Sequence, residues 1–290
     1  MVNLLNVGNQ HVLIISPVRN EVSRVYEMYV SLRNQSHTNW TLCFGDNASE
    51  DGTSELINKI VREDPRCKVN AFSSPVPIHD NFKRTIEWAL RSCSHDFVQF
   101  LAADDKLGGE LYFESALKLM SESSALMACG LVRGFSEYGE LETVDFHQFA
   151  ALSSGPERER FAANNYWVCN LLFGFYSSCH FEETVSKSIS CFTSNLSSDW
   201  WFAYGASIDT PPAYSNSLLY LKYLKSIPYS SAHYSIRESS AFKLPSWVHV
   251  FTFPWKQLGD RIFRQPLCKS IRLVAMFQFR EFKDLVYFRR

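Results

Sequence analysis

The amino-acid sequence predicts an α/β domain built on an open, mostly parallel sheet that helices flank. Two observations carry this prediction. Short apolar runs alternate with helical patterns through the first hundred residues, the order of strands and crossover helices in a parallel sheet. The runs are apolar throughout, as strands buried on both faces are. A composition of 46% hydrophobic and 20% charged residues over 290 positions is enough to bury such a core.

Four apolar runs set the expected order of elements in the first half of the chain. Each run is short, and the stretches between them place apolar residues at helical spacing. Strands are expected at 12–16, 40–44, 67–72 and 97–103. The first helix is expected to include Val22 and to end near Gln35, the second to follow an N-cap at Ser49, and the third to run from about Phe82 to Leu90.

The second half of the chain is less regular. A helix is expected from Leu111 to Met120, followed by a hairpin that turns near Tyr138 and Gly139. Residues 153–160 are expected to be a loop, a helix to begin at Asp199, and strand-like pieces to occupy 218–236. We expect a catalytic unit over 1–242, with halves 1–105 and 106–242, and a helical extension over 243–290.

The extension is basic and aromatic. Residues 243–290 hold ten Lys or Arg and three acids, with aromatic residues interleaved. Three interpretations stand beside one another: amphipathic helices packed on the main unit, a peripheral contact with anionic lipid, or a surface for a partner protein.

Bulk properties narrow the setting. The formal net charge of −1 gives no global attraction to nucleic acid, so no nucleic-acid partner is expected. The eight cysteines form no CxxC pair or zinc-ligand spacing. The amino terminus does not resemble a signal peptide, and no run approaches the roughly 20 apolar residues of a membrane span. A reducing cytoplasm is therefore the expected location.

Polar residues follow three of the expected strands. Asn20, Asp46 and the pair Asp104-Asp105 lie at or just past strand carboxyl ends, where ligands bind in open α/β sheets. Acids at the end of an apolar strand are costly unless they are solvated, paired or bound to a cation. Alone, the acid pair is equally explained by a helix cap and a solvated turn, Asp46 is better explained by a helix-capping turn, and the segment with Asn20 by a turn.

Taken in order, these motifs resemble glycosyltransferase family 2, whose catalytic domain has the Rossmann-like GT-A fold with an open mixed sheet. The resemblance covers roughly residues 10 to 242. The matching segments are VLIISPVRNE, CFGDNASEDGTSELI, HDNFKRTIEWAL, FLAADDKL, SSDWWFAYGASI and HYSIRESSA. Six short motifs in order are specific for the family and say little about the substrate.

The resemblance assigns a role to each matching position. It implies that Mn²⁺ or Mg²⁺ is held by Asp104, with His233 either an additional ligand or a structural histidine. It implies that Asp199, a helix cap by position alone, is the catalytic base. The positions expected to bind the nucleotide sugar are Pro17, Arg19, Glu21, Asp46, Asn81, Arg84, Asp105 and Arg237.

The implied activity is an inverting transfer of a sugar from a nucleoside diphosphate to a hydroxyl of a glycan or lipid-linked acceptor, in cell-surface polysaccharide synthesis. The sequence departs from the family pattern at Ala102, where the first acid of Asp-x-Asp is expected, at Arg19, where an aromatic residue is usual, and at Arg237, which replaces a histidine. The alternative is a catalytically decayed binding or scaffold protein. GxGxxG and P-loop strings are absent, which argues against a dehydrogenase or a P-loop enzyme.

Overall fold

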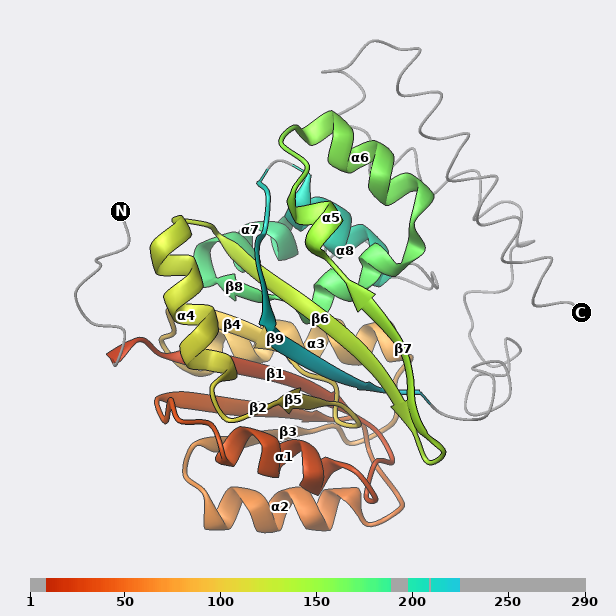
Figure 1. Cartoon of the computed structure of the whole chain (residues 1–290). Helices are drawn as coiled ribbons and strands as arrows, with labels where there is room; N and C mark the ends of the chain where they lie inside the picture. The colour runs from red at the N-terminus through yellow and green to blue at the C-terminus, as the bar shows by residue number, and fades with distance from the viewer. Residues whose placement is uncertain (1–8, 189–197, 209, 225–290) are drawn as a thin grey trace, which may run out of the picture. The chain divides into compact units, whose positions relative to one another are not determined.

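The computed structural model describes residues 9–188, 198–208 and 210–224, and in them a nine-stranded mixed sheet (Figure 1). The strand order is β3-β2-β1-β4-β8-β6-β9-β5, with β7 paired to β6. The strands are β1 Val12–Val18, β2 Trp40–Asp46, β3 Cys67–Ala71, β4 Phe97–Phe100, β5 Lys106–Gly108, β6 Met127–Ser136, β7 Gly139–Asp145, β8 Phe175–Ser177 and β9 Ala213–Tyr223.

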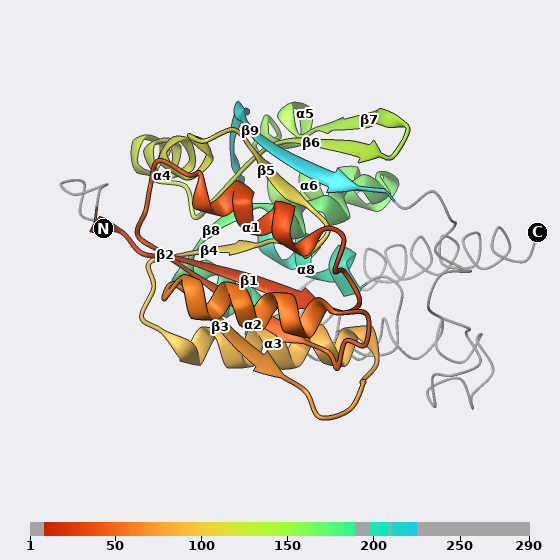
Figure 2. The ribbon, with the colours of Figure 1, turned by 90° about the horizontal axis from the view of Figure 1, so that it is seen from below.

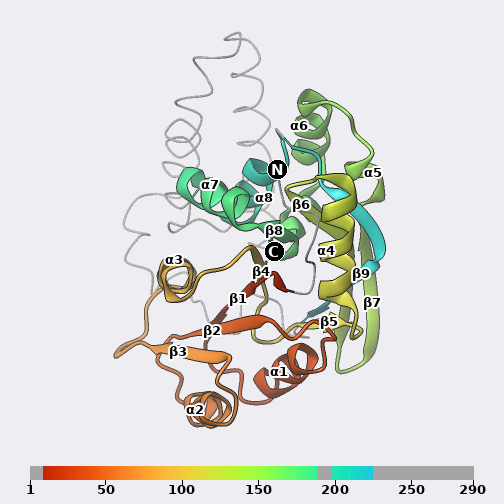
Figure 3. The ribbon, with the colours of Figure 1, turned by 90° about the vertical axis from the view of Figure 1, so that its left-hand side faces the viewer.

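Helices lie on both faces of this sheet, with α1, α2 and α4 on one side and α3, α7 and α8 on the other (Figure 3). The helices are α1 Val25–Arg33, α2 Thr53–Glu63, α3 Ile78–Ser92, α4 Tyr112–Ser123, α5 His147–Ala150, α6 Gly155–Asn164, the 3-10 helix η2 Tyr166–Phe173, α7 Ser178–Ser188 and α8 Ser198–Ser207. Within the residues described, no helix is both long and apolar enough to cross a membrane.

The parallel half of the sheet confirms the predicted order of strand and helix. All seven residues of β1 and of β2 are buried, which explains why both runs are apolar without alternation. Strand β1 lies between β2 and β4 and is parallel to both, and β2 is parallel to β3 (Figure 2). The carboxyl ends of β1, β2 and β4 therefore meet at one edge, as the sequence predicted.

A glycine near this edge lets helix and sheet approach closely. A Cβ atom on Gly45 would lie 1.8 Å from Oγ1 of Thr85, so no other residue fits where α3 crosses β2. This contact fixes the height of α3 over the strand that ends in Asp46.

Three local predictions are wrong. Ser49 is not the N-cap of α2, because the cap is Gly52 in the left-handed region at φ 96° and the helix begins at Thr53. The helix after β1 begins at Val25, while Val22 lies in the preceding turn and is 39% exposed. Strand β4 ends at Phe100 rather than at residue 103, and a short strand, β5, follows the turn.

The expected loop at 153–160 is also wrong, because α6 begins at Gly155. Its Arg158 is 2% exposed and donates from all three guanidinium nitrogens, to the carbonyls of Ser207, Ile208 and Leu152, each at 2.7 Å. The segment was expected to be a loop, whereas it forms a helix whose arginine satisfies carbonyls at the end of α8. Arg158 thereby fixes the carboxyl end of the helix that begins beside Asp199.

Other parts of the second half agree with the sequence. The hairpin forms from β6 and β7, and α8 begins at Ser198, one residue before the expected start. The predicted strand after residue 218 is part of β9, which begins earlier, at Ala213. The chain divides into two units, the first of residues 1–159 and 167–224; residues 160–166 belong to the second, and the rest of that unit lies outside the described residues. The predicted boundary at 242 stays a prediction.

Candidate active site

The candidate site lies at the edge where β1, β2 and β4 end, and hydrogen bonds join the first two of the loops there. The Asn20 amide donates to Oγ of Ser49 at 3.0 Å, and the Glu50 amide donates to Oδ1 of Asn20 at 2.9 Å. The Glu21 amide donates to Oγ1 of Thr53 at 2.8 Å. Asn20 adopts φ 53°, a left-handed conformation that asparagine tolerates better than most residues. The loops after β1 and β2 thus form one ordered surface.

Pro17 and Arg19 flank the end of β1. Pro17 is buried within the strand, whereas Arg19 is partly exposed and donates from Nη1 to the carbonyl of Asn47 at 2.9 Å. Arg19 is therefore the accessible member of this pair, and its guanidinium plane lies beside the loop that follows β2.

Asp46 is 1% exposed, and its carboxylate accepts hydrogen bonds from the loop after β2 and from the first turn of α2. Oδ1 accepts from the amide of Ser49 at 3.2 Å and from its hydroxyl at 2.6 Å, and Oδ2 accepts from the hydroxyl of Ser54. In this structure Asp46 orders the loop that leads into α2. A base edge bound here would share the carboxylate with these two serines.

Asn47 is a structural residue that the sequence analysis did not single out. It is 1% exposed, and its side-chain amide both donates to and accepts from the backbone of Val76, at 2.8 Å each. Its own amide donates to the carbonyl of Val18 at 2.9 Å. Asn47 thereby joins the ends of β1 and β2 to the segment before α3. Val76 is 29 residues from Asn47 in the sequence, so no local pattern predicts this contact.

The two predicted residues on α3 occupy different environments. Asn81 is 3% exposed and donates from Nδ2 to the carbonyl of Val18 at 3.3 Å, while its Oδ1 accepts from the hydroxyl of Thr85 at 3.1 Å. Arg84 is exposed, with its guanidinium carbon 5.7 Å from the ring centre of Phe72. Asn81 supports the end of β1, and Arg84 lies beside the residue that follows β3.

The turn after β4 carries the acid pair. The Asp105 amide donates to the carbonyl of Ala102 at 3.1 Å and closes the turn. The Asp105 side chain is 2% exposed and accepts from the Tyr220 hydroxyl and from the Tyr223 amide, each at 2.7 Å. Burial, and then the charge of Asp104, raise the pKa of the Asp105 carboxyl well above its usual range. Asp104, in contrast, is partly exposed. The structure thus distinguishes a buried acid from a partly exposed one.

This arrangement fits a divalent cation that takes some of its ligands from the protein and the others from a diphosphate. No group of three or more His, Cys, Asp or Glu side chains in the described residues could hold a metal by itself. Magnesium-type ions bind through one or two carboxylates together with substrate phosphates and keep several waters. With the oxygens of Asp105 engaged by β9, Asp104 is the carboxylate of this turn that suits such an ion.

The remaining predicted residues lie partly or wholly outside the described structure. Asp199 is the second residue of α8, and its side chain is not among those described. His233 and Arg237 lie outside the described residues, as does the basic extension at 243–290. Their roles stay predictions.

Lys222 is a second residue that the sequence analysis missed. Its ammonium donates to Oδ1 of Asn170 at 2.8 Å and lies 4.9 Å from the ring centre of Phe173. It is partly exposed and shares a face of β9 with Tyr220, two residues earlier. Because side chains alternate between the two faces of a strand, the sequence could have placed Tyr220 and Lys222 on one face of β9. It could not have indicated which residues they contact.

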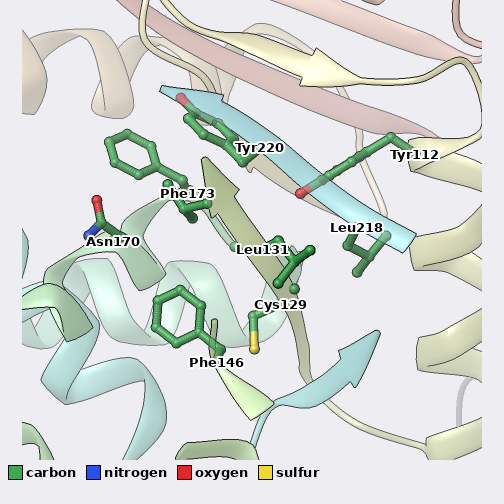
Figure 4. Close-up of a pocket in the computed structure, with 11 residues that line it drawn as sticks. Tyr112, Cys129, Leu131, Phe146, Asn170, Phe173, Leu218 and Tyr220 are labelled. Carbon is green, nitrogen blue, oxygen red and sulfur yellow. The ribbon is translucent and has the colours of Figure 1, made fainter. Parts of the chain in front are cut away.

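A small pocket lies between β6, β9 and the end of η2, and Figure 4 shows its lining, including Phe173 and Tyr220. The lining is mostly apolar, and the cavity of about 10 Å³ has room for about one water molecule. This pocket is therefore part of the core beneath the turn that carries Asp104 and Asp105, and it is not the nucleotide-sugar site.

The family is decided by a comparison of the whole sequence with known families. The profile described as Glycosyl transferase family 2 matches residues 13–181, more than half of the chain. The chain belongs to glycosyltransferase family 2. An uncharacterized glycosyltransferase of Haemophilus influenzae is 31% identical over 117 residues, which cover 40% of this chain and 45% of the relative.

Solved structures of this family's fold agree with the architecture. Crystal structures of S. aureus TarS match with a TM-score of 0.55, one at 16% identity over 74% of this chain and 37% of TarS. A complex of TarS residues 1–349 with UDP-GlcNAc matches at 14% identity over 92% of this chain and 66% of that structure. The match spans less than half the length of the Haemophilus influenzae relative and of the longer TarS chain. This glycosyltransferase family 2 chain therefore has the GT-A fold that its motifs implied.

Proposed function

We propose that this family 2 chain transfers a sugar from a nucleoside diphosphate to a hydroxyl of a glycan or lipid-linked acceptor, with inversion at the anomeric carbon. The observation that supports it best is the position of Asp104. It is partly exposed on a closed turn at the carboxyl end of β4, next to the end of β1, whose loop is hydrogen-bonded to the loop after β2. This is the edge at which open α/β sheets bind nucleotides.

The proposed mechanism gives the chain's residues three tasks. Asp199 removes the proton of the acceptor hydroxyl, which is a poor nucleophile until a carboxylate takes that proton. Asp104 holds Mn²⁺ or Mg²⁺, which supplies a positive charge to the departing diphosphate when bound. Arg84 or Arg237 adds a second positive charge there. A direct displacement needs no covalent enzyme intermediate, so no second carboxylate nucleophile is required.

The nucleotide can be identified by ligand-dependent stability. We expect one of UDP, GDP, TDP or CMP to raise the melting temperature of the full chain in the presence of Mn²⁺, because a ligand that binds only the folded state stabilises it by roughly 2.7 kcal/mol at a hundred times its dissociation constant. The complex of TarS with UDP-GlcNAc supports UDP as the first candidate. If none of the four shifts the melting temperature with or without Mn²⁺, nucleotide-sugar transfer is the wrong proposal.

Two observations favour a second candidate, a donor-binding protein that has lost catalysis. Ala102 stands where the first acid of Asp-x-Asp is expected, and the Asp46 carboxylate accepts hydrogen bonds from Ser49 of its loop and from Ser54 of α2. Such a protein would be stabilised by a nucleotide, yet it would release no nucleoside diphosphate from any nucleotide sugar in the presence of acceptors. Measuring both quantities on one preparation separates the two candidates.

The basic extension supports a proposal about location. Ten Lys or Arg against three acids over residues 243–290 would attract the anionic inner face of a membrane, where polysaccharide precursors on lipid carriers would meet a cytoplasmic enzyme. We expect the full chain to co-sediment with vesicles containing anionic lipid at low ionic strength and to dissociate at high salt. Vesicles of zwitterionic lipid are the control, and equal binding to both would refute the electrostatic contact.

A further inference from the structure

The hydroxyl of Tyr220 joins both ends of the turn that carries Asp104. It accepts a hydrogen bond from the amide of Ala102 at 3.3 Å and donates one to Oδ2 of Asp105 at 2.7 Å. Ala102 and Asp105 also bond to each other through the backbone, at 3.1 Å. Asp104 lies between these two residues. One side-chain oxygen from β9 thus completes the hydrogen bonding of the turn.

The surroundings of Tyr220 hold this oxygen in place. Tyr220 is 2% exposed, and its ring stacks on Phe173 with a centroid separation of 4.6 Å and an angle of 23°. Strand β5, which leaves the turn, pairs with β9 so that Leu107 faces Tyr220. The neighbouring Tyr223 amide occupies the other oxygen of Asp105 at 2.7 Å. The turn is therefore attached to β9 by backbone pairing and by three hydrogen bonds around Asp105 and Ala102.

We propose that Tyr220 is a positioning residue for the metal-binding carboxylate of Asp104, acting through Ala102 and Asp105. The inference rests on the proposed function and adds a residue to it. Ala102 has no carboxylate with which to anchor its end of the turn, but its amide is held by the tyrosine oxygen. A metal ligand whose backbone is ordered beforehand loses less conformational freedom when the metal binds. Removal of the Tyr220 hydroxyl should therefore lower the affinity for the metal as well as the stability of the fold.

A buried tyrosine hydroxyl can also matter only to stability, and the chain offers a matched control for that case. Tyr176 on β8 is fully buried, and its hydroxyl donates to the carbonyl of Leu171. Tyr220→Phe and Tyr176→Phe therefore each delete one buried hydroxyl and keep the ring. Tyr220→Phe is expected to lower the unfolding free energy more than Tyr176→Phe, because it removes two hydrogen bonds, one of them to the buried Asp105 carboxylate. Tyr220→Phe alone changes the turn beneath Asp104.

The test is a titration of the full chain with Mn²⁺, following free Mn²⁺ by its electron paramagnetic resonance signal, with UDP present in one series and GDP in another. Tyr220→Phe is expected to raise the Mn²⁺ dissociation constant about 10- to 100-fold, the range typical of lost outer-shell partners. Tyr176→Phe is expected to leave it within about 2-fold. Circular dichroism confirms that each variant is folded.

Two results would overturn the inference: Mn²⁺ affinity unchanged in Tyr220→Phe, or weakened equally in both variants. If Tyr220→Phe does not fold, Asp105→Ala removes the acceptor of the Tyr220 hydroxyl, and unchanged Mn²⁺ affinity in that variant counts against the inference equally. A wild-type chain that binds no Mn²⁺ with either nucleotide refutes the metal part of the proposed function, and the role of Tyr220 falls with it. A wild type that binds Mn²⁺ normally while Tyr220→Phe does too refutes the role of Tyr220 alone.

Discussion

Replacing Asp104 with alanine is expected to abolish metal-dependent nucleotide binding and to reduce sugar transfer by a factor on the order of 10³. The reason is the division of labour within the acid pair. The Asp105 oxygens accept hydrogen bonds from β9, whereas Asp104 is partly exposed and is the carboxylate of this turn that we propose as the metal ligand. Removing a group that stabilises developing charge costs roughly 10² to 10³ in rate, and loss of the cation adds to that cost. Release of nucleoside diphosphate from the donor measures the rate.

The matched control is Asp96→Ala. Asp96 precedes β4 at the opposite edge of the sheet, where its carboxylate accepts from the amide of His11 at 2.8 Å. This variant also removes one partly engaged acid beside the same strand, yet it is expected to keep the Mn²⁺-dependent rise in melting temperature with the stabilising nucleotide. Asp104→Ala should lose that rise while melting normally without ligand. Equal responses of the two variants to Mn²⁺ would show that the metal lies elsewhere.

The sequence predicted the parts of this site that depend on local pattern. Apolar runs without alternation identified β1 and β2 as strands buried on both faces, and parallel topology then placed Asp46 and Asp104 at one edge. The motifs also identified the family, because they occur in its order along the chain. Most of them lie in the residues that the family profile matches. The strands and the motifs are each defined by residues close together in the sequence, and the meeting of Asp46 and Asp104 at one edge follows from the order of the strands.

What escaped prediction depends on partners far apart in the chain. Asp105 was expected to bind the donor and to support Asp104, which stays a prediction, but no pattern indicated that its hydrogen-bond donors are Tyr220 and Tyr223, 115 and 118 residues later. Arg158 lay in a segment that was expected to be a loop, and two of its carbonyl partners are 49 and 50 residues away. A buried charge or carboxylate needs partners to be tolerated, but the sequence alone does not say which residues supply them. The roles of such residues become visible only after the fold is known.

Asp199 presents the sharpest choice between a structural and a chemical role, and two variants separate them. Asp199 lies in the first turn of α8, where asparagine and serine have helix propensities close to that of aspartate, but neither can remove a proton from a hydroxyl. If Asp199 only stabilises this first turn, Asp199→Asn and Asp199→Ser should retain activity. If it is the catalytic base, both should lower the rate of transfer by about 10² to 10⁴, with nucleotide and Mn²⁺ binding unchanged.

The carboxyl end of α8 is held by contacts that do not involve Asp199, which limits the effect of a change at Asp199. The carbonyls of Ser207 and Ile208 are held by the buried Arg158, so the carboxyl end of α8 is fixed independently of its first turn. A change at Asp199 is therefore expected to stay local, with a melting temperature close to that of the wild type. The decisive comparison is the ratio of kcat to that of the wild type at saturating donor, measured beside the nucleotide-induced shift in melting temperature. Normal kcat in both variants would refute the base assignment, whereas a lost rate with an intact shift would support it, because only the proton acceptor would have been removed.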